Sequence, residues 1–188
     1  MNNKYNLILN NGLIMGSIMG AFFILLSLTY YVLGTDMFSI AFSIINFLLL
    51  IGIYVGFMIY SNKTLCKKHL DGNLNYWDGV LNAFITGLVA AIIGLVYNFV
   101  FVKFFDPEYM TKAFEKAMEM LENNPNIPQE AVEKAYKDME SMTPLKYSLQ
   151  GLKMNLIITV IFALITAAFT RKKNDAFSDE IIIEEKSE

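Results

Sequence analysis

The stretch that decides the fold is Gly79–Val102, which reads GVLNAFITGLVAAIIGLVYNFVFV and holds no charged residue in 24 positions. A helix needs roughly 20 apolar residues to cross a bilayer, whose hydrocarbon core solvates ions poorly. Three further uncharged stretches have the same character: Leu7–Leu33, Met37–Tyr60 and Met154–Thr170. Together they predict an all-α, polytopic membrane protein with four transmembrane helices.

The composition agrees with this class and argues against others. Of the 188 residues, 55% are hydrophobic, a share that suits a chain with four spans. The net charge of −3 provides no basic surface, so no nucleic-acid partner is expected. Although Lys4 precedes the first stretch, its 27 uncharged residues exceed the roughly 7–15 of a signal peptide, and it is expected to remain as a span.

The spans are predicted at about residues 7–33, 37–60, 79–105 and 149–170, within a membrane domain of residues 1–173. Gly34–Asp36 is predicted to be a tight turn, and Ser61–Asp78 a polar loop that ends with Asp78 as the N-cap of the third span. The fourth uncharged stretch is short, so its helix is expected to extend back towards Leu145. Residues 174–188 form an acidic tail that is expected to be flexible.

Residues 106–146, between the third and fourth spans, change in character. They are rich in acids and lysines, and two amphipathic stripes at helical spacing flank the breaking segment Asn123–Asn126. This pattern predicts an extramembrane helical hairpin. Its stripes are expected to pack on each other, with Phe114 or Met118 near Val132, Tyr136 or Met139; the alternatives are the membrane surface and a protein partner.

Basic residues that flank the spans indicate the orientation. Lys4, the cluster Lys63/Lys67/Lys68 and Arg171–Lys173 fall on one side of a four-span topology. Lysines that are spread over a long extramembrane region weigh less in the positive-inside rule. Both termini are therefore expected in the cytoplasm, with the hairpin outside.

Several segments resemble a known family. They are Phe105–Tyr109, the Glu- and Met-rich Lys112–Glu122, Pro128–Ala135, Met142–Leu145 and the basic stop Lys172–Lys173. With the order of the spans, they resemble the bacterial membrane family catalogued as domain of unknown function 4199, up to about Lys173. The resemblance implies a four-span protein of the inner membrane of Gram-negative bacteria, and it implies no activity.

Small residues recur every four positions in three of the spans. Such stripes let helix backbones approach closely in lipid. Internal packing of the bundle is the favoured interpretation, and a homodimer face is the alternative. The residues expected to pack are Gly12, Gly16, Gly20, Gly52, Gly56 and Gly87.

Four amides lie deep in the apolar stretches: Asn46, Asn82, Asn98 and Asn155. An unpartnered amide in hydrocarbon is costly, so these side chains are expected to face one another or a wet cavity. Hydrogen bonding between helices is the favoured interpretation, and a path for a polar solute is the alternative. The spans hold no Asp, Glu or His that would carry a proton or a cation.

No motif for catalysis, nucleotide binding or metal binding is present. Cys66 and His69 lie three positions apart, but a structural zinc site needs four ligands and no second pair exists. No metal, cofactor or enzymatic activity is therefore expected. The favoured function is a non-catalytic structural, assembly or accessory subunit, with the lipid bilayer and a homodimer or membrane-protein partner; the alternative is a small solute or lipid transporter.

Overall fold

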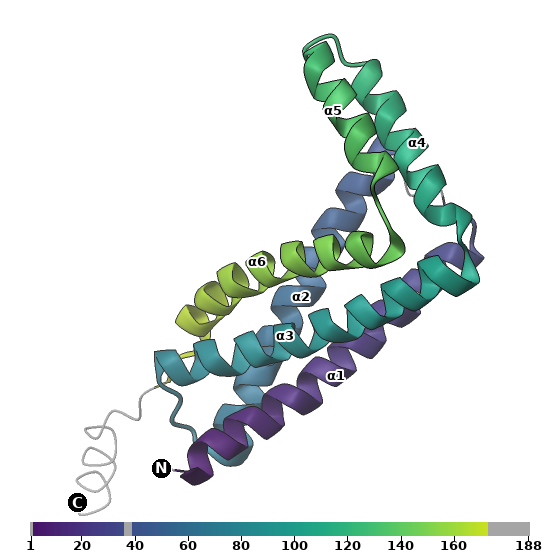
Figure 1. Ribbon diagram of the computed structural model, residues 1–188. Helices are drawn as coiled ribbons and strands as arrows, with labels where there is room; N and C mark the ends of the chain where they lie inside the picture. Colours follow the sequence, from purple (N-terminus) through teal and green to yellow (C-terminus); the bar gives the residue numbers. More distant parts are fainter. Residues whose placement is uncertain (1, 36–38, 173–188) are drawn as a thin grey trace, which may run out of the picture.

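The computed structural model describes residues 2–35 and 39–172. Asp36, Met37 and the tail 174–188, which figure in the predicted turn, second span and C-terminus, lie outside the described residues. Six α-helices and one π-helical segment follow one another: α1 (Asn2–Val32), α2 (Ile40–His69), α3 (Tyr76–Val100), η1 (Phe101–Phe105), α4 (Glu108–Glu122), α5 (Gln129–Glu140) and α6 (Pro144–Thr170) (Figure 1). The described part contains no strand beyond an isolated bridge between Leu74 and Lys172, so the all-α prediction is confirmed there.

Four segments are long and apolar enough to cross a membrane: α1, α2, α3 with η1, and α6. They indicate a multi-pass membrane protein. α3 contacts α1 on one side and α6 on the other, while α2 contacts all three of them. α1 and α3 run in one direction and α2 and α6 in the other, which places the start of α1 near the ends of α2 and α6 (Figure 1).

The second helix is longer than the sequence predicted. α2 continues through Ser61 to His69, so most of the expected polar loop is helical. The periodicity of its buried face also continues, with Met58, Ser61, Asn62 and Leu65 all buried. The helix ends at His69, and the turn that follows contains Asp71 and Gly72, which have positive φ angles of 48° and 81°. We infer that α2 continues past Tyr60 because Ser61 and Asn62 form hydrogen bonds inside the bundle.

The third span begins at a cap that differs from the expected one, and the fourth begins close to the expected Leu145. Asn75, not Asp78, is the N-cap of α3, and its side chain accepts a hydrogen bond from the Asp78 amide. α6 begins at Pro144 because Thr143 caps it and proline suits the first helical turn.

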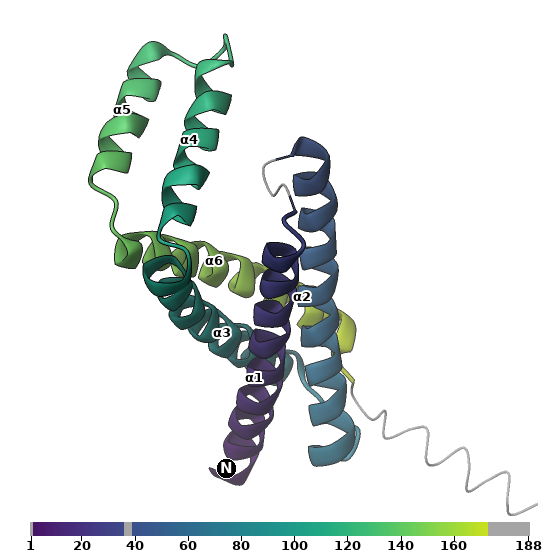
Figure 2. The ribbon, with the colours of Figure 1, turned by 90° about the vertical axis from the view of Figure 1, so that its right-hand side faces the viewer.

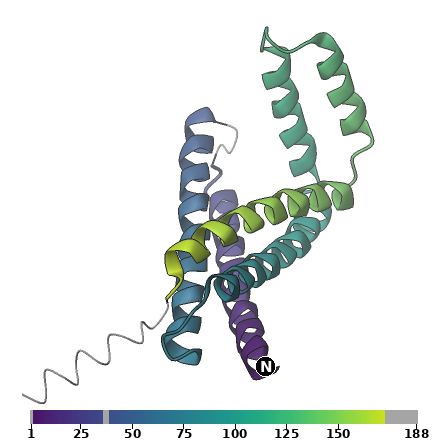
Figure 3. The same ribbon diagram turned by 90° about the vertical axis from the view of Figure 1, so that its left-hand side faces the viewer.

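α4 and α5 project away from the four long helices and contact each other side by side (Figures 2 and 3). The Tyr136 hydroxyl donates a hydrogen bond to the Glu122 carboxylate, and Met118 is buried. Phe114 lies edge-on to Tyr147 of α6, with the ring centres 6.0 Å apart. These contacts link the two projecting helices to each other and to the start of α6.

Candidate functional site

Three glycines of α1 lie close against α3. A Cβ atom placed on Gly12 would lie 2.6 Å from the Ile85 side chain, and one on Gly16 would lie 2.6 Å from the Thr86 carbonyl oxygen. At Gly20 the nearest atoms, in Ile93, would be 3.0 Å away. Any larger residue would therefore push the two helices apart, most of all at Gly16, where the obstacle is backbone.

The other predicted packing glycines behave differently from one another. A Cβ atom on Gly87 of α3 would lie 2.5 Å from Thr159 of α6 and 2.9 Å from Met58 of α2, so Gly87 lies where three helices meet. Gly52 and Gly56 do not pack in this way, because a Cβ atom on either would meet no described atom within 4 Å. The stripe expected in α2 therefore faces away from the other described helices.

A network of buried amides and hydroxyls joins all four long helices near the start of α1. Asn82 of α3 is its centre: its Oδ1 accepts from Asn11 Nδ2 at 2.9 Å, and its Nδ2 donates to Asn62 Oδ1 at 2.9 Å and to Ser61 Oγ at 2.8 Å. Two threonines complete the network. Ser61 Oγ lies 2.9 Å from Thr86 Oγ1, and Asn62 Nδ2 donates to Thr170 Oγ1 at 2.9 Å.

Among the predicted amides, only Asn82 belongs to this polar network. Its partners Asn11, Ser61 and Asn62 were not predicted, although the sequence carries a signal for each. Asn11 adjoins Gly12 on the glycine face of α1. Asn62 continues the four-residue spacing of Tyr54 and Met58, and Ser61 lies three positions after Met58 on the same helix face. Because Ser61 and Asn62 were assigned to the expected loop, their helical spacing was not used.

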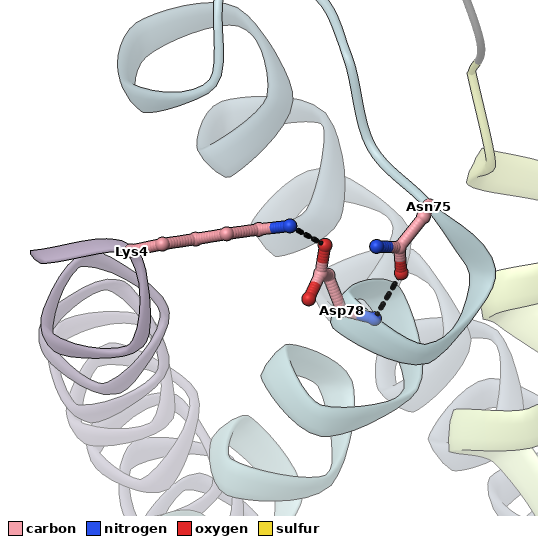
Figure 4. A network of polar contacts seen from close by, with 3 residues as sticks. All are labelled: Lys4, Asn75 and Asp78. Atoms are coloured by element: carbon pink, nitrogen blue, oxygen red, sulfur yellow. Dashed lines mark hydrogen bonds and ion pairs between the residues drawn. The ribbon is translucent and has the colours of Figure 1, made fainter. Parts of the chain in front are cut away.

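An ion pair closes the same end of the bundle. Lys4 of α1 pairs with Asp78, which is buried in the first turn of α3 beside its cap Asn75 (Figure 4). A carboxylate in the first turn of a helix also interacts favourably with the helix dipole. Leu74, which directly precedes Asn75, forms a β-bridge with Lys172 and so joins the α2–α3 connection to the end of α6. This end is therefore held by polar contacts among all four long helices.

The other half of the bundle contains a cavity of about 390 Å³ between α1, α2, α3 and α6, which we call the apolar cavity. Its lining is mainly aliphatic and aromatic, with Asn46 and Asn155 among its few polar side chains. Oδ1 of Asn46 is buried and has no hydrogen-bond partner in the described part of the chain. The structure thus brings two of the predicted amides to one cavity without joining them to the polar network.

A second cavity of about 250 Å³ adjoins the first, and we call it the tyrosine cavity. The two share Phe23, Ser27 and Gly94. Asn98, the fourth predicted amide, lines the tyrosine cavity together with Tyr31, Tyr97, Tyr109 and Tyr147. The Tyr97 hydroxyl donates to Ser27 Oγ at 3.1 Å, which joins α3 to α1 where the cavities meet.

The tyrosine cavity ends at the π-helical segment η1. Phe101, its first residue, is buried and contacts the rings of Tyr31, Tyr97, Phe105 and Tyr109, with ring centres 5.1–6.4 Å apart. Short π-helical segments are frequent at functional sites. Burial also raises the pKa of Tyr109, which lies beyond the long helices at the start of α4, so its hydroxyl remains neutral at physiological pH.

The remaining candidate residues lie apart from these features. Cys66 is buried in the last turns of α2, whereas His69 is exposed. Within residues 2–35 and 39–172, no group of three or more His, Cys, Asp or Glu side chains is placed to hold a metal ion. The arrangement therefore provides neutral hydrogen-bonding groups and apolar surface.

The chain was compared with known proteins. A model of the family described as "Protein of unknown function (DUF4199)" matches residues 14–172. No curated protein and no solved structure matches the chain.

Proposed function

Because the chain belongs to the DUF4199 family of proteins of unknown function, we propose a role from its own geometry: a non-catalytic structural, assembly or accessory subunit of the bacterial inner membrane. Both termini face the cytoplasm in this proposal, and α4 and α5 form a hairpin on the opposite side. The role fits a bundle in which the polar network holds the four long helices together while α4 and α5 project outward.

The observation that carries the proposal is the polar network centred on Asn82. Its members are neutral, buried and hydrogen-bonded to one another, so they stabilise one arrangement of the four helices. Neutral amides and hydroxyls that already satisfy each other supply neither a general base nor a nucleophile. This use of intramembrane polar residues favours a structural role over catalysis.

The projecting helices are the part of this chain that is best placed to meet a partner. They carry exposed apolar side chains, including Met120 and Tyr136, among charged residues. Methionine adapts its shape to varied surfaces and is common at contact sites. In this proposal the four-helix bundle anchors the protein, and the hairpin makes the contact.

The test is recovery of a partner from native membranes after crosslinking. The full chain carries an affinity tag, and a second variant has residues 108–140 replaced by a short Gly/Ser linker. A stoichiometric protein partner is expected with the full chain and not with the linker variant. The thermal transition of the linker variant in detergent serves as the folding control. Equal recovery by both variants, or recovery of no stoichiometric partner by the full chain, contradicts the proposal.

A second candidate function is transport of a small solute or a lipid. The apolar cavity favours it, because Asn46 and Asn155 line the same half-open cavity. The largely apolar lining suits a lipid better than a polar solute. Flux of a labelled substrate into vesicles that contain only this protein would support transport over the accessory role.

A further inference from the structure

The two cavities share part of their lining and lie in the half of the bundle that the polar network does not reach. The amides Asn46 and Asn155 and the hydroxyls of Ser27 and Tyr30 lie towards the end where the hairpin begins, because they occupy the last turns of α1 and the first half of α2 and α6. Farther along the same helices the lining becomes apolar, as at Ala90 and Phe162. A volume of about 390 Å³ falls within the ordinary range of small-molecule sites.

The charge of the lining restricts the chemistry of an occupant. None of the described residues that line either cavity is Lys, Arg, His, Asp or Glu. A phosphate or an ammonium group placed there would be desolvated without an opposite charge, which is costly. The lining therefore favours an occupant whose polar end is uncharged.

The amide of Asn46 restricts the chemistry further. Its buried Oδ1 accepts no hydrogen bond from the described residues. Exchanging the positions of the amide oxygen and nitrogen would leave a buried N–H in the same place, so either assignment leaves one buried polar atom unsatisfied. A ligand hydroxyl satisfies either atom because it both donates and accepts, whereas a carbonyl only accepts.

We propose that the apolar cavity, with the adjoining tyrosine cavity, binds a neutral lipid that carries a free hydroxyl group, of the diacylglycerol type. The hydroxyl donates a hydrogen bond to Oδ1 of Asn46. The hydrocarbon lies against the apolar wall formed by residues such as Phe23, Ala90 and Phe162. Binding of this lipid is independent of the accessory role, and its tests below do not involve a protein partner.

The first experiment compares three photoactivatable probes with identical diazirine-bearing chains: a diacylglycerol, its O-methyl ether and a phosphatidylcholine. The purified full chain is reconstituted in phosphatidylcholine vesicles that contain one probe at a time, and labelled peptides are identified by mass spectrometry. The diacylglycerol probe is expected to label cavity-lining residues roughly tenfold more than the methyl ether, because the ether cannot donate a hydrogen bond. Equal labelling of those residues by the diacylglycerol and either other probe overturns the proposal.

An Asn46→Leu variant tests the hydrogen bond itself. Leucine is similar in size and removes an unsatisfied group, so the fold is expected to persist. The preference for diacylglycerol over its methyl ether should disappear in this variant. If the preference persists, Asn46 does not bind the hydroxyl and the proposal fails.

A matched pair of glycine variants tests the cavity. Gly94 lines both cavities and Gly52 lines neither, yet an added Cβ atom meets no described atom within 4 Å at either position. Gly94→Leu is expected to fill the space and to reduce diacylglycerol labelling at least fivefold, whereas Gly52→Leu should match the wild type. Equal labelling of both variants overturns the proposal.

Competition keeps the test decisive if Gly94→Leu lowers the thermal transition of the protein. Unlabelled dioleoylglycerol, added to wild-type protein in the same vesicles, is expected to suppress labelling of the cavity residues. An equal amount of added phosphatidylcholine should leave that labelling unchanged. Failure of dioleoylglycerol to compete overturns the proposal regardless of how the glycine variant folds.

Discussion

At the scale of single residues, two asparagines in the spans have opposite surroundings. Asn82 is fully buried and bonded to Asn11, Ser61 and Asn62, whereas the buried oxygen of Asn46 has no partner in the described part of the chain. The same side chain therefore stabilises the bundle at one position and leaves a polar atom unsatisfied at the other. Alanine substitution at Asn46 is therefore a control for alanine substitution at Asn82.

Asn82→Ala is expected to lower the free energy of unfolding by about 1–3 kcal/mol, because it leaves buried partners without hydrogen bonds. Asn46→Ala should change it by less than about 1 kcal/mol, since the oxygen that it removes makes no bond to the described residues. Thermal unfolding of the purified protein in detergent measures both. A larger loss at Asn46 than at Asn82 would show that the polar network does not stabilise the bundle.

The residue scale also shows how far sequence alone predicted the candidate site. That amides in apolar stretches need partners follows from the chemistry of hydrocarbon, and Asn82 has such partners. Which amides meet depends on how the helices are rotated about their axes, and no local pattern fixes that rotation. Asn46, Asn155 and Asn98 therefore lie at cavities, although their sequence context resembles that of Asn82.

At the scale of elements, the glycines of α1 and α2 resemble each other in sequence and differ in surroundings. Gly16 lies against the backbone of α3, whereas Gly52 faces no described atom within 4 Å. A four-residue spacing of small residues predicts that close packing is possible. Whether a neighbouring helix uses the stripe depends on tertiary arrangement, and no described helix of this chain packs against Gly52 or Gly56.

Gly16→Leu is expected to destabilise the protein by roughly 1–3 kcal/mol or to prevent folding, because the side chain would separate α1 from α3. Gly52→Leu is the matched control, since it is also a glycine in a long helix and should be tolerated. Gly34 is unsuitable as a control because its φ angle of +59° strains any larger residue. Comparable loss of thermal stability in the two variants would refute the α1–α3 contact.

The hairpin offers a prediction about pH. The hydrogen bond to Glu122 raises the pKa of Tyr136 above its ordinary value of 10.0, because the bond requires the protonated hydroxyl. The stabilisation is therefore fully present below pH 10 and is lost as the pH rises through the raised pKa. The difference in phenolate absorbance between wild type and Tyr136→Phe should titrate above pH 10.0, and Glu122→Gln should lower that midpoint. A midpoint at or below 10.0 would show that the bond does not form.

Element boundaries could be predicted only where the chain itself supplies the signal. The Asp71–Gly72 turn is such a case, because its left-handed backbone depends on local chemistry. The extension of α2 to His69 was missed because Ser61 and Asn62 look like loop residues until the partners on α1, α3 and α6 are known. Long-range hydrogen bonds outweighed local preference there.

At the scale of the whole molecule, the direction of the four long helices leads to a topology test. The start of α1 and the end of α6 lie at one end of the bundle, and α4 and α5 project from the other (Figure 1). A reporter fused after Lys173 is expected to behave as cytoplasmic, and a reporter inserted at Asn124 as external. The insertion point lies in an exposed turn, so it should not disturb packing. The opposite pair of results would invert the proposed orientation.

The distribution of contacts along the bundle has a mechanical consequence. Hydrogen bonds and an ion pair fasten all four long helices at the end that holds Lys4 and Asn82, while the far half contains the two cavities. The four helices are therefore expected to move least at the end with the polar network and most at the end with the cavities. Backbone amides around Asn82 should therefore exchange with heavy water far more slowly than those around Gly94. The separation of the helices around the cavities is then the distance in the protein that changes most easily.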